Sequence, residues 1–320
     1  MFSRRCLRSL RFLLIACVLG IASTSSAFAQ QTHLLVITGV PGDEEHAQKF
    51  QTWATTFIDA AKKKDAVPDA NITSLSDKQS TRAGVEKAFA DLASRVRPGD
   101  AVFILLLGHG SFNGTQAFFN LPGPDLTVEE WNKLLTKLPA QRIAFVNTAS
   151  SSGAFLPTIA APGRVIVTAT KTGGERNETQ FPEFFVAAYN DPAADRDRNG
   201  HVSVAEAFEY AKTKVVQAFQ QKGLLLTEHA TLDDGGEGRL ASTIFLGTGR
   251  GDTASGQEKI DTSNPEVRAL VDARDALQRQ IAALQARKPS MDPEQYNAEM
   301  ERLLTELAVK TKAIRDLQKK

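Results

Sequence analysis

Four short runs of mostly apolar residues constrain the fold of this chain more than any other feature. They lie at residues 34–37, 101–107, 143–146 and 164–169. None of them alternates strictly between apolar and polar residues, which is typical of strands buried on both faces of a parallel sheet. Segments with helical periodicity separate the runs. We therefore predict an α/β fold in which helices cover a mostly parallel sheet.

Three segments between these runs carry the periodicity and capping residues of helices. The longest is residues 44–64, a second helix follows the N-capping pair at 80–81, and a third begins with a capping box at 127–130 and extends through Leu138. In a sheet of this kind, binding and catalytic groups lie outside the carboxyl ends of the strands. Loops that follow the apolar runs are therefore the first places to look for a site.

The N-terminal residues 1–29 have the pattern of a secretory signal peptide. Four arginines precede an apolar segment at 12–21, which is too short to span a bilayer, and residues 27–29 form a small-residue cleavage pattern. We expect cleavage before Gln30 and export to the periplasm or the extracellular space, with no transmembrane span. Leu14–Cys17 also resembles a bacterial lipoprotein box, which would lipidate Cys17, but the apolar segment continues past this cysteine.

Charge and cysteine counts exclude several classes of function. The chain has 38 basic and 37 acidic residues. Removing the signal peptide, with its four arginines and no acid, leaves 34 and 37, a formal charge of −3. This balance lacks the basic footprint of a nucleic-acid-binding protein. Both cysteines, Cys6 and Cys17, lie in the predicted signal peptide, so the mature chain has no disulfide, thiolate metal site or cysteine nucleophile.

The C-terminal part differs in composition from the rest of the chain. Residues 248–263 are rich in Gly, Thr, Ser and Asp, and we interpret them as a linker. Residues 264–320 contain two helical patterns, 265–287 and 292–320, whose apolar residues recur at heptad spacing. We predict an α-helical hairpin or short coiled coil there, which mediates self-association or docking of a partner.

Residues 195–206 match the calcium-binding loop of an EF-hand at each defining position. Oxygen-bearing side chains stand at the first, third, fifth and ninth positions, a glycine at the sixth and a glutamate at the twelfth. This spacing turns alternate residues inward toward a hard cation, which prefers oxygen ligands. The predicted ligands of Ca²⁺ are Asp195, Asp197, Asn199, the backbone carbonyl of His201, Ser203 and Glu206.

Two further loops combine residues that can carry out catalysis. His109 follows the run at 101–107 and stands between Gly108 and Gly110. A histidine there can act as a base, and glycines let backbone N–H groups approach a developing oxyanion. Residues 147–154, after the next run, are small enough to form a sharp turn that presents a side chain.

Each of these motifs also has a purely structural interpretation. Residues 195–206 can be a polar turn before a helix at 204–221, with Glu206 in the first turn, where a carboxylate favours the helix dipole. His109 can be an ordinary loop histidine. The segment 147–154 can be a loop of small residues without a chemical role.

Taken together, these segments resemble the caspase-like cysteine peptidases, a clan that includes caspases, metacaspases and legumain. The resemblance covers about residues 34–247 and depends on three segments: LLLGHGS at 105–111, LPGPD at 121–125 and RIAFVNTASSSG at 142–153. It implies a caspase-like three-layer sandwich. Segments at 168–170, 206–211 and 226–230 look like those of secreted bacterial proteins of this type.

The resemblance also assigns roles to residues. It implies that His109 is the histidine of a catalytic dyad and Gly110 a donor of the oxyanion hole, and the position of the family's cysteine falls on Ser150. A serine is a weaker nucleophile than a thiolate, and a Ser-His pair normally needs a third residue to orient the imidazole. Asp125 is the nearest candidate in sequence.

The sequence therefore predicts an exported, catalytically deficient pseudopeptidase. It would act as a binding or scaffold module for a protein or peptide partner, with a calcium-stabilised structure. The alternative is a hydrolase that uses Ser150 as nucleophile and His109 as base.

Overall fold

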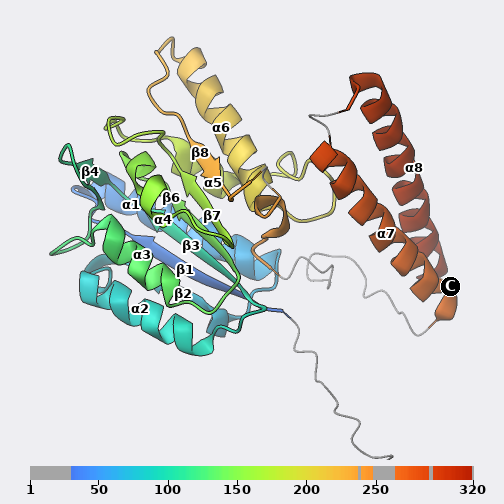
Figure 1. Cartoon of the computed structure of the whole chain (residues 1–320), viewed down its shortest axis with the longest axis horizontal. Coiled ribbons are helices and arrows are strands. Elements are labelled where there is room, and N and C mark those ends of the chain that lie inside the picture. Colours follow the sequence, from blue (N-terminus) through green and yellow to red (C-terminus); the bar gives the residue numbers. More distant parts are fainter. Residues whose placement is uncertain (1–29, 237–238, 248–263, 288–290, 319–320) are drawn as a thin grey trace, which may run out of the picture. The chain divides into compact units, whose positions relative to one another are not determined.

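The computed structural model describes residues 30–236, 239–247, 264–287 and 291–318 (Figure 1). Contacts between residues divide the chain after Gln30. The predicted signal peptide at 1–29 and the predicted linker at 248–263 lie outside the described residues.

A six-stranded sheet with the order β2-β1-β3-β6-β7-β8 forms the centre of the domain. All neighbours are parallel except β7 and β8. The strands are β1 Thr32–Thr38, β2 Ile72–Leu75, β3 Ala101–Leu107, β6 Arg142–Asn147, β7 Arg164–Thr168 and β8 Thr231–Asp233. The prediction of an α/β fold with a mostly parallel sheet is confirmed.

Each of the four apolar runs forms a strand, and its burial explains its composition. Every residue of β1, β3 and β7 is buried. Leu34 of β1 pairs with Phe103 of β3, and Phe103 pairs in turn with Ala144 of β6. Helices on both faces exclude water from these strands, so neither face of the strands needs polar side chains.

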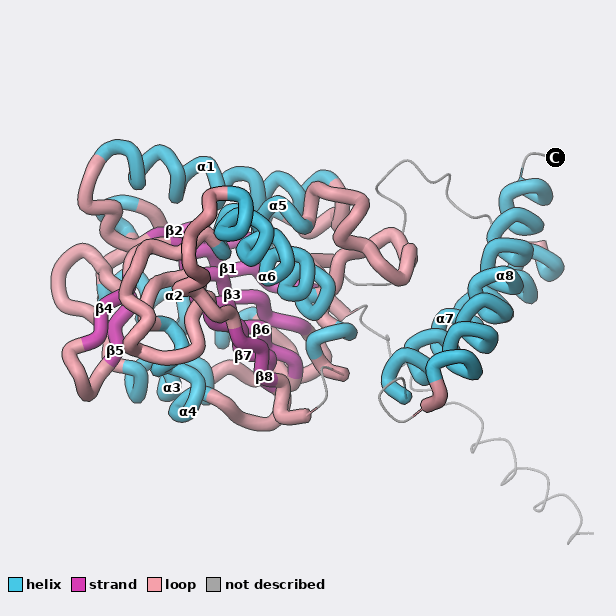
Figure 2. The backbone as a smooth tube through the Cα atoms, turned by 90° about the horizontal axis from the view of Figure 1, so that it is seen from above, coloured by secondary structure: helices cyan, strands magenta, loops and turns pink. Residues whose placement is uncertain are grey.

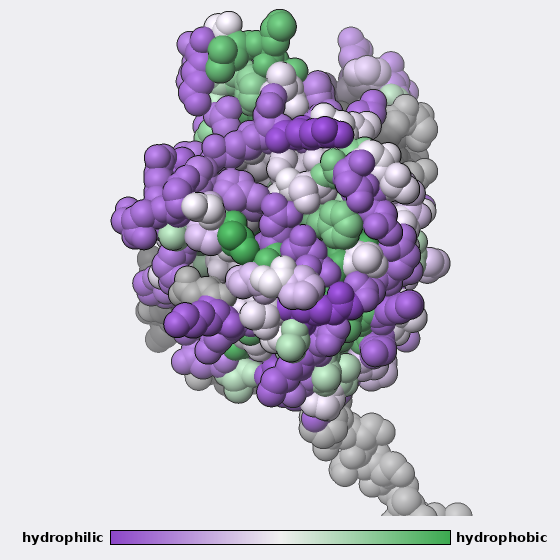
Figure 3. Space-filling view, turned by 90° about the vertical axis from the view of Figure 1, so that its left-hand side faces the viewer, coloured by the Kyte–Doolittle hydropathy of each residue, from purple (hydrophilic) through white to green (hydrophobic). Residues whose placement is uncertain are grey.

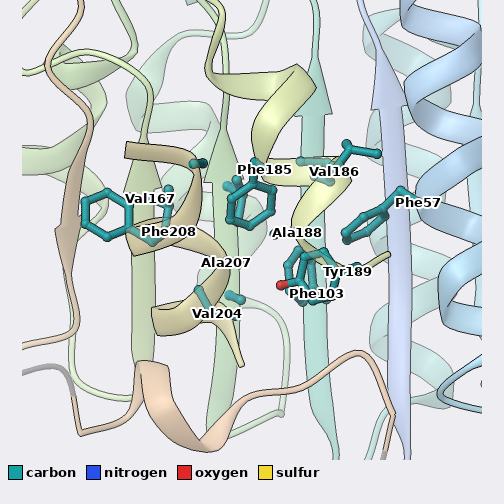
Figure 4. Close-up of a cluster of buried hydrophobic side chains, with 14 of the residues drawn as sticks. Phe57, Phe103, Val167, Phe185, Val186, Ala188, Tyr189, Val204, Ala207 and Phe208 are labelled. Carbon is teal, nitrogen blue, oxygen red and sulfur yellow. The ribbon is translucent and has the colours of Figure 1, made fainter. Parts of the chain in front are cut away.

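Helices cover the two faces of the sheet in two groups (Figure 2). On one face α1, α5 and α6 pack with one hydrophobic cluster, and on the other α2, α3 and α4 pack with a second. Their bounds are α1 Glu44–Lys63, α2 Arg82–Arg95, α3 Val128–Thr136, α4 Leu156–Ile159, α5 Phe181–Ala188 and α6 Val204–Gln221. Figure 4 shows the aromatic centre of the first cluster, where Phe57, Phe103 and Tyr189 meet.

Capping residues set the helix starts that the sequence predicts. The side chain of Thr81 accepts a hydrogen bond from Gly84 N, and Thr127 forms a complete capping box with Glu130. One helix end differs from the prediction, because α3 ends at Thr136 and not at Leu138. Pro139 disfavours helical geometry at the residue before it, which explains the earlier end.

Several shorter elements were not predicted from the sequence. Strands β4 Gly110–Phe112 and β5 Ala117–Phe119 form a small antiparallel hairpin, and β8 adds an antiparallel edge to the main sheet. Helices α4 and α5 were also missed. The single-turn helices are η1 Asp69–Asn71, η2 Asp77–Gln79, η3 Ser152–Phe155 and η4 Ala241–Thr243.

The C-terminal helices α7 Pro265–Arg287 and α8 Pro293–Gln318 pack on each other. Their shared cluster contains Leu277, Ile281, Leu284 and Leu303, which occupy the predicted heptad positions. Asp292 caps α8 by accepting hydrogen bonds from Glu294 N and Gln295 N. The described part of the chain includes no helix with both the length and the apolar character that a membrane span requires.

Candidate functional site

The loops after β1 and β3 lie at the carboxyl edge of the sheet. At this point the chain stops adding strands on one side of β1 and begins to add them on the other side. From β1 the chain passes through α1 to β2 on one side, and then through α2 to β3 on the other side of β1. Open α/β sheets bind ligands at such a point. The loop after β1 contains Pro41 and the loop after β3 contains His109, so the candidate dyad histidine lies at this position.

The imidazole of His109 is held by the backbone of the neighbouring loop. Its Nε2 lies 3.0 Å from the carbonyl oxygen of Pro41. A carbonyl can only accept a hydrogen bond, so Nε2 carries the proton and Nδ1 of the neutral ring is the acceptor nitrogen. His46 and Phe50 of α1 enclose the ring, with centroids 4.7 Å and 5.3 Å from that of His109, both edge-on.

Ser150 lies at the end of the adjacent strand β6, and its hydroxyl contacts Gly110. Ser150 Oγ donates to the carbonyl oxygen of Gly110 at 2.9 Å and accepts from Gly110 N at 3.3 Å. The described residues contain no hydrogen bond between Ser150 and His109. A Cβ on Gly110 would lie 2.2 Å from the carbonyl oxygen of Ser150, so only glycine permits this approach.

Asp125, the candidate for a third catalytic residue, contacts the backbone of its own loop. One of its carboxylate oxygens accepts a hydrogen bond from Leu121 N at 2.7 Å, which shapes the loop before α3. The structure therefore brings His109, Gly110 and Ser150 to one edge of the sheet, but it gives His109 a backbone carbonyl as its orienting group. Sequence patterns do not reveal such a backbone contact.

The loop that follows β7, residues 169–180, fixes the segment around Ser150. Ser151, which has a left-handed φ of +59°, donates its N–H to the carbonyl of Glu175 at 2.8 Å. Thr179 Oγ1 donates to the carbonyl of Thr148 at 2.6 Å. Hydrogen bonds from this loop therefore hold the segment on both sides of Ser150.

His46 is a further residue of this edge that the sequence did not indicate. Its Nδ1 lies 2.8 Å from a carboxylate oxygen of Asp43, and its Nε2 lies 3.2 Å from Glu178. The hydrogen bond that His46 donates to Asp43, with a smaller contribution from Glu178, raises the pKa of His46 above its ordinary value. The two carboxylates therefore favour the protonated form of the imidazole that lies against the ring of His109.

The predicted calcium loop brings three carboxylates together before α6. Oxygen atoms of Asp195, Asp197 and Glu206 lie within 4.8 Å of one another. Gly200, with φ of +91°, makes the turn that returns the chain. The carboxylate of Asp195 accepts hydrogen bonds from Asn199 N and Gly200 N, which fixes the curvature of the loop.

The electrostatics of this cluster favour a cation. Burial, followed by the neighbouring charge of Glu206, raises the pKa of Asp197 to about 7. Burial and repulsion between neighbouring carboxylates both disfavour the charged form, so the group holds its proton more tightly. All the side-chain donors are oxygens, which hard divalent ions prefer. The loop can therefore hold a metal ion.

The remaining predicted ligands occupy different positions around the loop. Asn199 lies beside Asp197, to which its side-chain nitrogen donates at 2.9 Å. Ser203 and Glu206 form the capping box of α6. The ring of His201 points away to Asp65, with Nδ1 2.9 Å from the carboxylate, so a contribution from His201 to a metal would come from its backbone carbonyl.

Comparisons with known proteins add little to this geometry. No protein-family model and no curated protein matches the sequence. Among solved structures, the chain is similar to the crystal structure of protein GSU0716 from Geobacter sulfurreducens. The two share 13% sequence identity over 63% of this chain and 92% of that chain, with a TM-score of 0.44.

Proposed function

We propose that this chain is an exported, non-catalytic caspase-like module that binds a protein or peptide partner and is stabilised by calcium. The observation that carries the proposal is the position of the Ser150 hydroxyl. It donates a hydrogen bond to the carbonyl oxygen of Gly110, at 2.9 Å, and not to an imidazole nitrogen.

This arrangement opposes catalysis in two ways. A serine becomes a nucleophile when a base accepts its proton. Here the hydroxyl of Ser150 is hydrogen-bonded to a backbone carbonyl, which is too weak a base to accept the proton. The N–H of Gly110, which the resemblance makes an oxyanion donor, points at the oxygen of Ser150. In this geometry the hydroxyl of Ser150 and the N–H of Gly110 are hydrogen-bonded to each other, so neither is directed at a substrate carbonyl.

In this proposal calcium is a structural ion bound by the loop at 195–206. The carboxylates of Asp195, Asp197 and Glu206 supply negative charge, and the backbone carbonyl of His201 and the oxygens of Asn199 and Ser203 complete the oxygen set of the loop. Calcium accepts six to eight such ligands in flexible geometry. Because Glu206 and Ser203 also start α6, an ion in the loop would hold the first turn of a helix that packs on the core.

A serine-directed fluorophosphonate tests the absence of a reactive serine. The probe reacts covalently with serines that a base activates, and intact-mass measurement counts the adducts. We expect wild type and Ser150→Ala to show the same low labelling at saturating calcium. An adduct on wild type that maps to Ser150 and disappears in His109→Ala would overturn the proposal.

One observation favours a hydrolase as the second candidate. The carbonyl of Pro41 orients the ring of His109 and leaves Nδ1 as the acceptor nitrogen, which supplies the orientation that a third catalytic residue normally gives. In this candidate the hydroxyl of Ser150 rotates from Gly110 to His109 when substrate binds. A fluorophosphonate adduct at Ser150 is the result that this candidate predicts.

A further inference from the structure

The ring of His201 attaches the calcium loop to the end of helix α1. Its Nδ1 lies 2.9 Å from a carboxylate oxygen of Asp65, a residue 136 positions earlier in the sequence. The side chain of Asp65 is 8% exposed and that of His201 is 21% exposed, so the pair is largely removed from water. His201 stands at the seventh position of the loop, where the ligand is the backbone carbonyl. The ring can therefore hold the loop from outside while the carbonyl faces the ion.

The surrounding backbone holds Asp65 in place. Just beyond it, Ala66 has a left-handed φ of +50°, and Val67 N donates to the carbonyl of Ala61 at 3.0 Å, which closes the turn. Gly247 packs against the same residue, because a Cβ there would lie 2.5 Å from the carbonyl oxygen of Asp65. Asp65 is therefore a fixed point for the loop that His201 attaches to it.

A buried hydroxyl lies on the inner side of the calcium loop. Tyr189 is 3% exposed, and its hydroxyl has no hydrogen-bond partner among the described residues. Figure 4 shows its oxygen on the side of the ring that faces Val204, the first residue of α6. Burial, followed by the charges of Asp65 and Glu206, raises the pKa of Tyr189, so both carboxylates lie near this hydroxyl. A buried hydroxyl without a partner costs stability, which indicates that a bound group completes this side of the loop.

The attachment point lies at the amino end of the sheet, away from the candidate dyad. Gly247, which packs on Asp65, accepts a hydrogen bond at 2.8 Å from Thr32 Oγ1, in the first residue of β1. His109 and Ser150 follow the carboxyl ends of β3 and β6. These ends lie on the left-hand side of Figure 1, which faces the viewer in Figure 3 as a surface of mixed hydrophilic and hydrophobic residues. A substitution at Asp65 is therefore at the opposite end of the strands from the dyad.

We propose that Asp65 is a positioning residue of the calcium loop and acts through His201. By holding the ring, Asp65 fixes the residue whose backbone carbonyl is the predicted ligand, so the loop has its curvature before the ion binds. Fixing a loop in its bound shape lowers the cost of binding, and outer groups that orient ligands commonly change metal affinity by about 10- to 100-fold. The inference rests on the proposed function, because it concerns the affinity of the calcium loop.

Titration calorimetry with calcium chloride, on the chain from Gln30 to Lys320, tests the proposal. Asp65→Ala and His201→Ala should each raise the Kd for calcium by about tenfold, and the double variant should raise it no further, because both remove the same contact. His201→Ala keeps the backbone carbonyl and removes only the attachment. A purely electrostatic effect would differ, since removing a carboxylate would weaken cation binding and removing a basic ring would strengthen it. Asp65→Asn, which removes the charge and keeps an acceptor oxygen for the ring, should bind calcium more tightly than Asp65→Ala.

The matched control is Asp59→Ala, which removes an exposed carboxylate of α1 that pairs with Lys63 and should leave the Kd unchanged. Melting curves in chelator verify that the variants are folded. A merely structural role would lower Tm in chelator and leave the Kd at its wild-type value, and that result overturns the proposal. It is also overturned if His201→Ala binds calcium as tightly as wild type or more tightly, or if the two effects add in the double variant. Absence of heat with wild type would refute the calcium loop itself, and with it the calcium in the proposed function.

Discussion

The proposed calcium site predicts that replacing Glu206 with glutamine abolishes most of the stabilisation by the ion. Glu206 is the last residue of the loop, the position that gives both carboxylate oxygens to the ion in calcium loops of this register. Glutamine keeps the length of the side chain and removes one charge. The matched control is Glu209→Gln, an exposed position one turn further along α6 with the same loss of charge.

The spacing of the three carboxylates gives the repulsion that a bound ion would remove, and the excess of ion over Kd sets the expected rise in Tm. At separations of up to 4.8 Å, an ionised pair repels by about 3 kcal/mol for an effective dielectric constant of about 20, before solvent screening reduces it. A cation removes this repulsion. Ion bound only to the folded state at about a tenfold excess over Kd stabilises it by about 1.4 kcal/mol, and for a domain of this size that raises Tm by roughly 3–6 °C.

Melting curves in millimolar calcium and in chelator, with titration calorimetry beside them, measure this effect. Wild type and Glu209→Gln should show the full rise in Tm, and Glu206→Gln less than about a third of it. The assignment of calcium fails if calorimetry detects no heat and chelator leaves the wild-type curve unchanged. It also fails if Glu206→Gln keeps the full rise.

Three further predictions concern other parts of the chain. Ser150→Cys should gain reactivity toward iodoacetamide that a second change, His109→Ala, lowers; equal rates would show that the two positions are uncoupled. Cutting after Gly247 should leave the domain folded, because α7 and α8 have their own cluster, and a Tm many degrees lower would refute this boundary. Burial raises the pKa of Glu228 to about 7, so the folded state binds its proton more tightly than the unfolded chain. The stability from that proton is complete below about pH 4.5 and is lost as pH rises through about 7. Glu228→Gln should therefore reduce the fall in Tm between about pH 5 and about pH 8, and a fall as steep as that of wild type would contradict the role of Glu228.

The central strands were predictable because burial on both faces leaves a plain signature. The residues 101–107 form β3 with the bounds expected from composition alone. The edge strand β8 has no such signature, since Thr231–Asp233 are only partly buried and pair with β7 from a distant part of the chain. A three-residue strand of this kind depends on tertiary pairing, which local patterns do not encode.

Some missed elements did carry local signals. The β4–β5 hairpin turns at residues 113–116, where Gly114 has φ of +102° and Asn113 Oδ1 accepts hydrogen bonds from Thr115 N and Gln116 N, and both glycine and asparagine are typical turn residues. Helix α5 has Pro182 in its first turn, where proline is favoured. Its residues are apolar around most of the helix, so their periodicity does not separate a helix from a buried strand.

The candidate site was predictable in its members and not in its hydrogen bonds. His109 and Ser150 follow adjacent strands, so the topology brings them to one edge. The proton of Ser150, however, is directed by the close approach of Gly110, and the ring of His109 by the carbonyl of Pro41. Both are backbone contacts between loops distant in sequence, and a pattern of side chains does not specify them.

Amide hydrogen exchange at Gly110, compared between wild type and Ser150→Ala, tests the central claim most directly. The account places the N–H of Gly110 on the hydroxyl oxygen of Ser150, so removing that oxygen exposes the amide. We predict exchange at Gly110 at least about tenfold faster in Ser150→Ala, with the neighbouring amides of β3 unchanged. Equal exchange rates in the two proteins would contradict the claim, because the hydroxyl would then be directed elsewhere and available to His109.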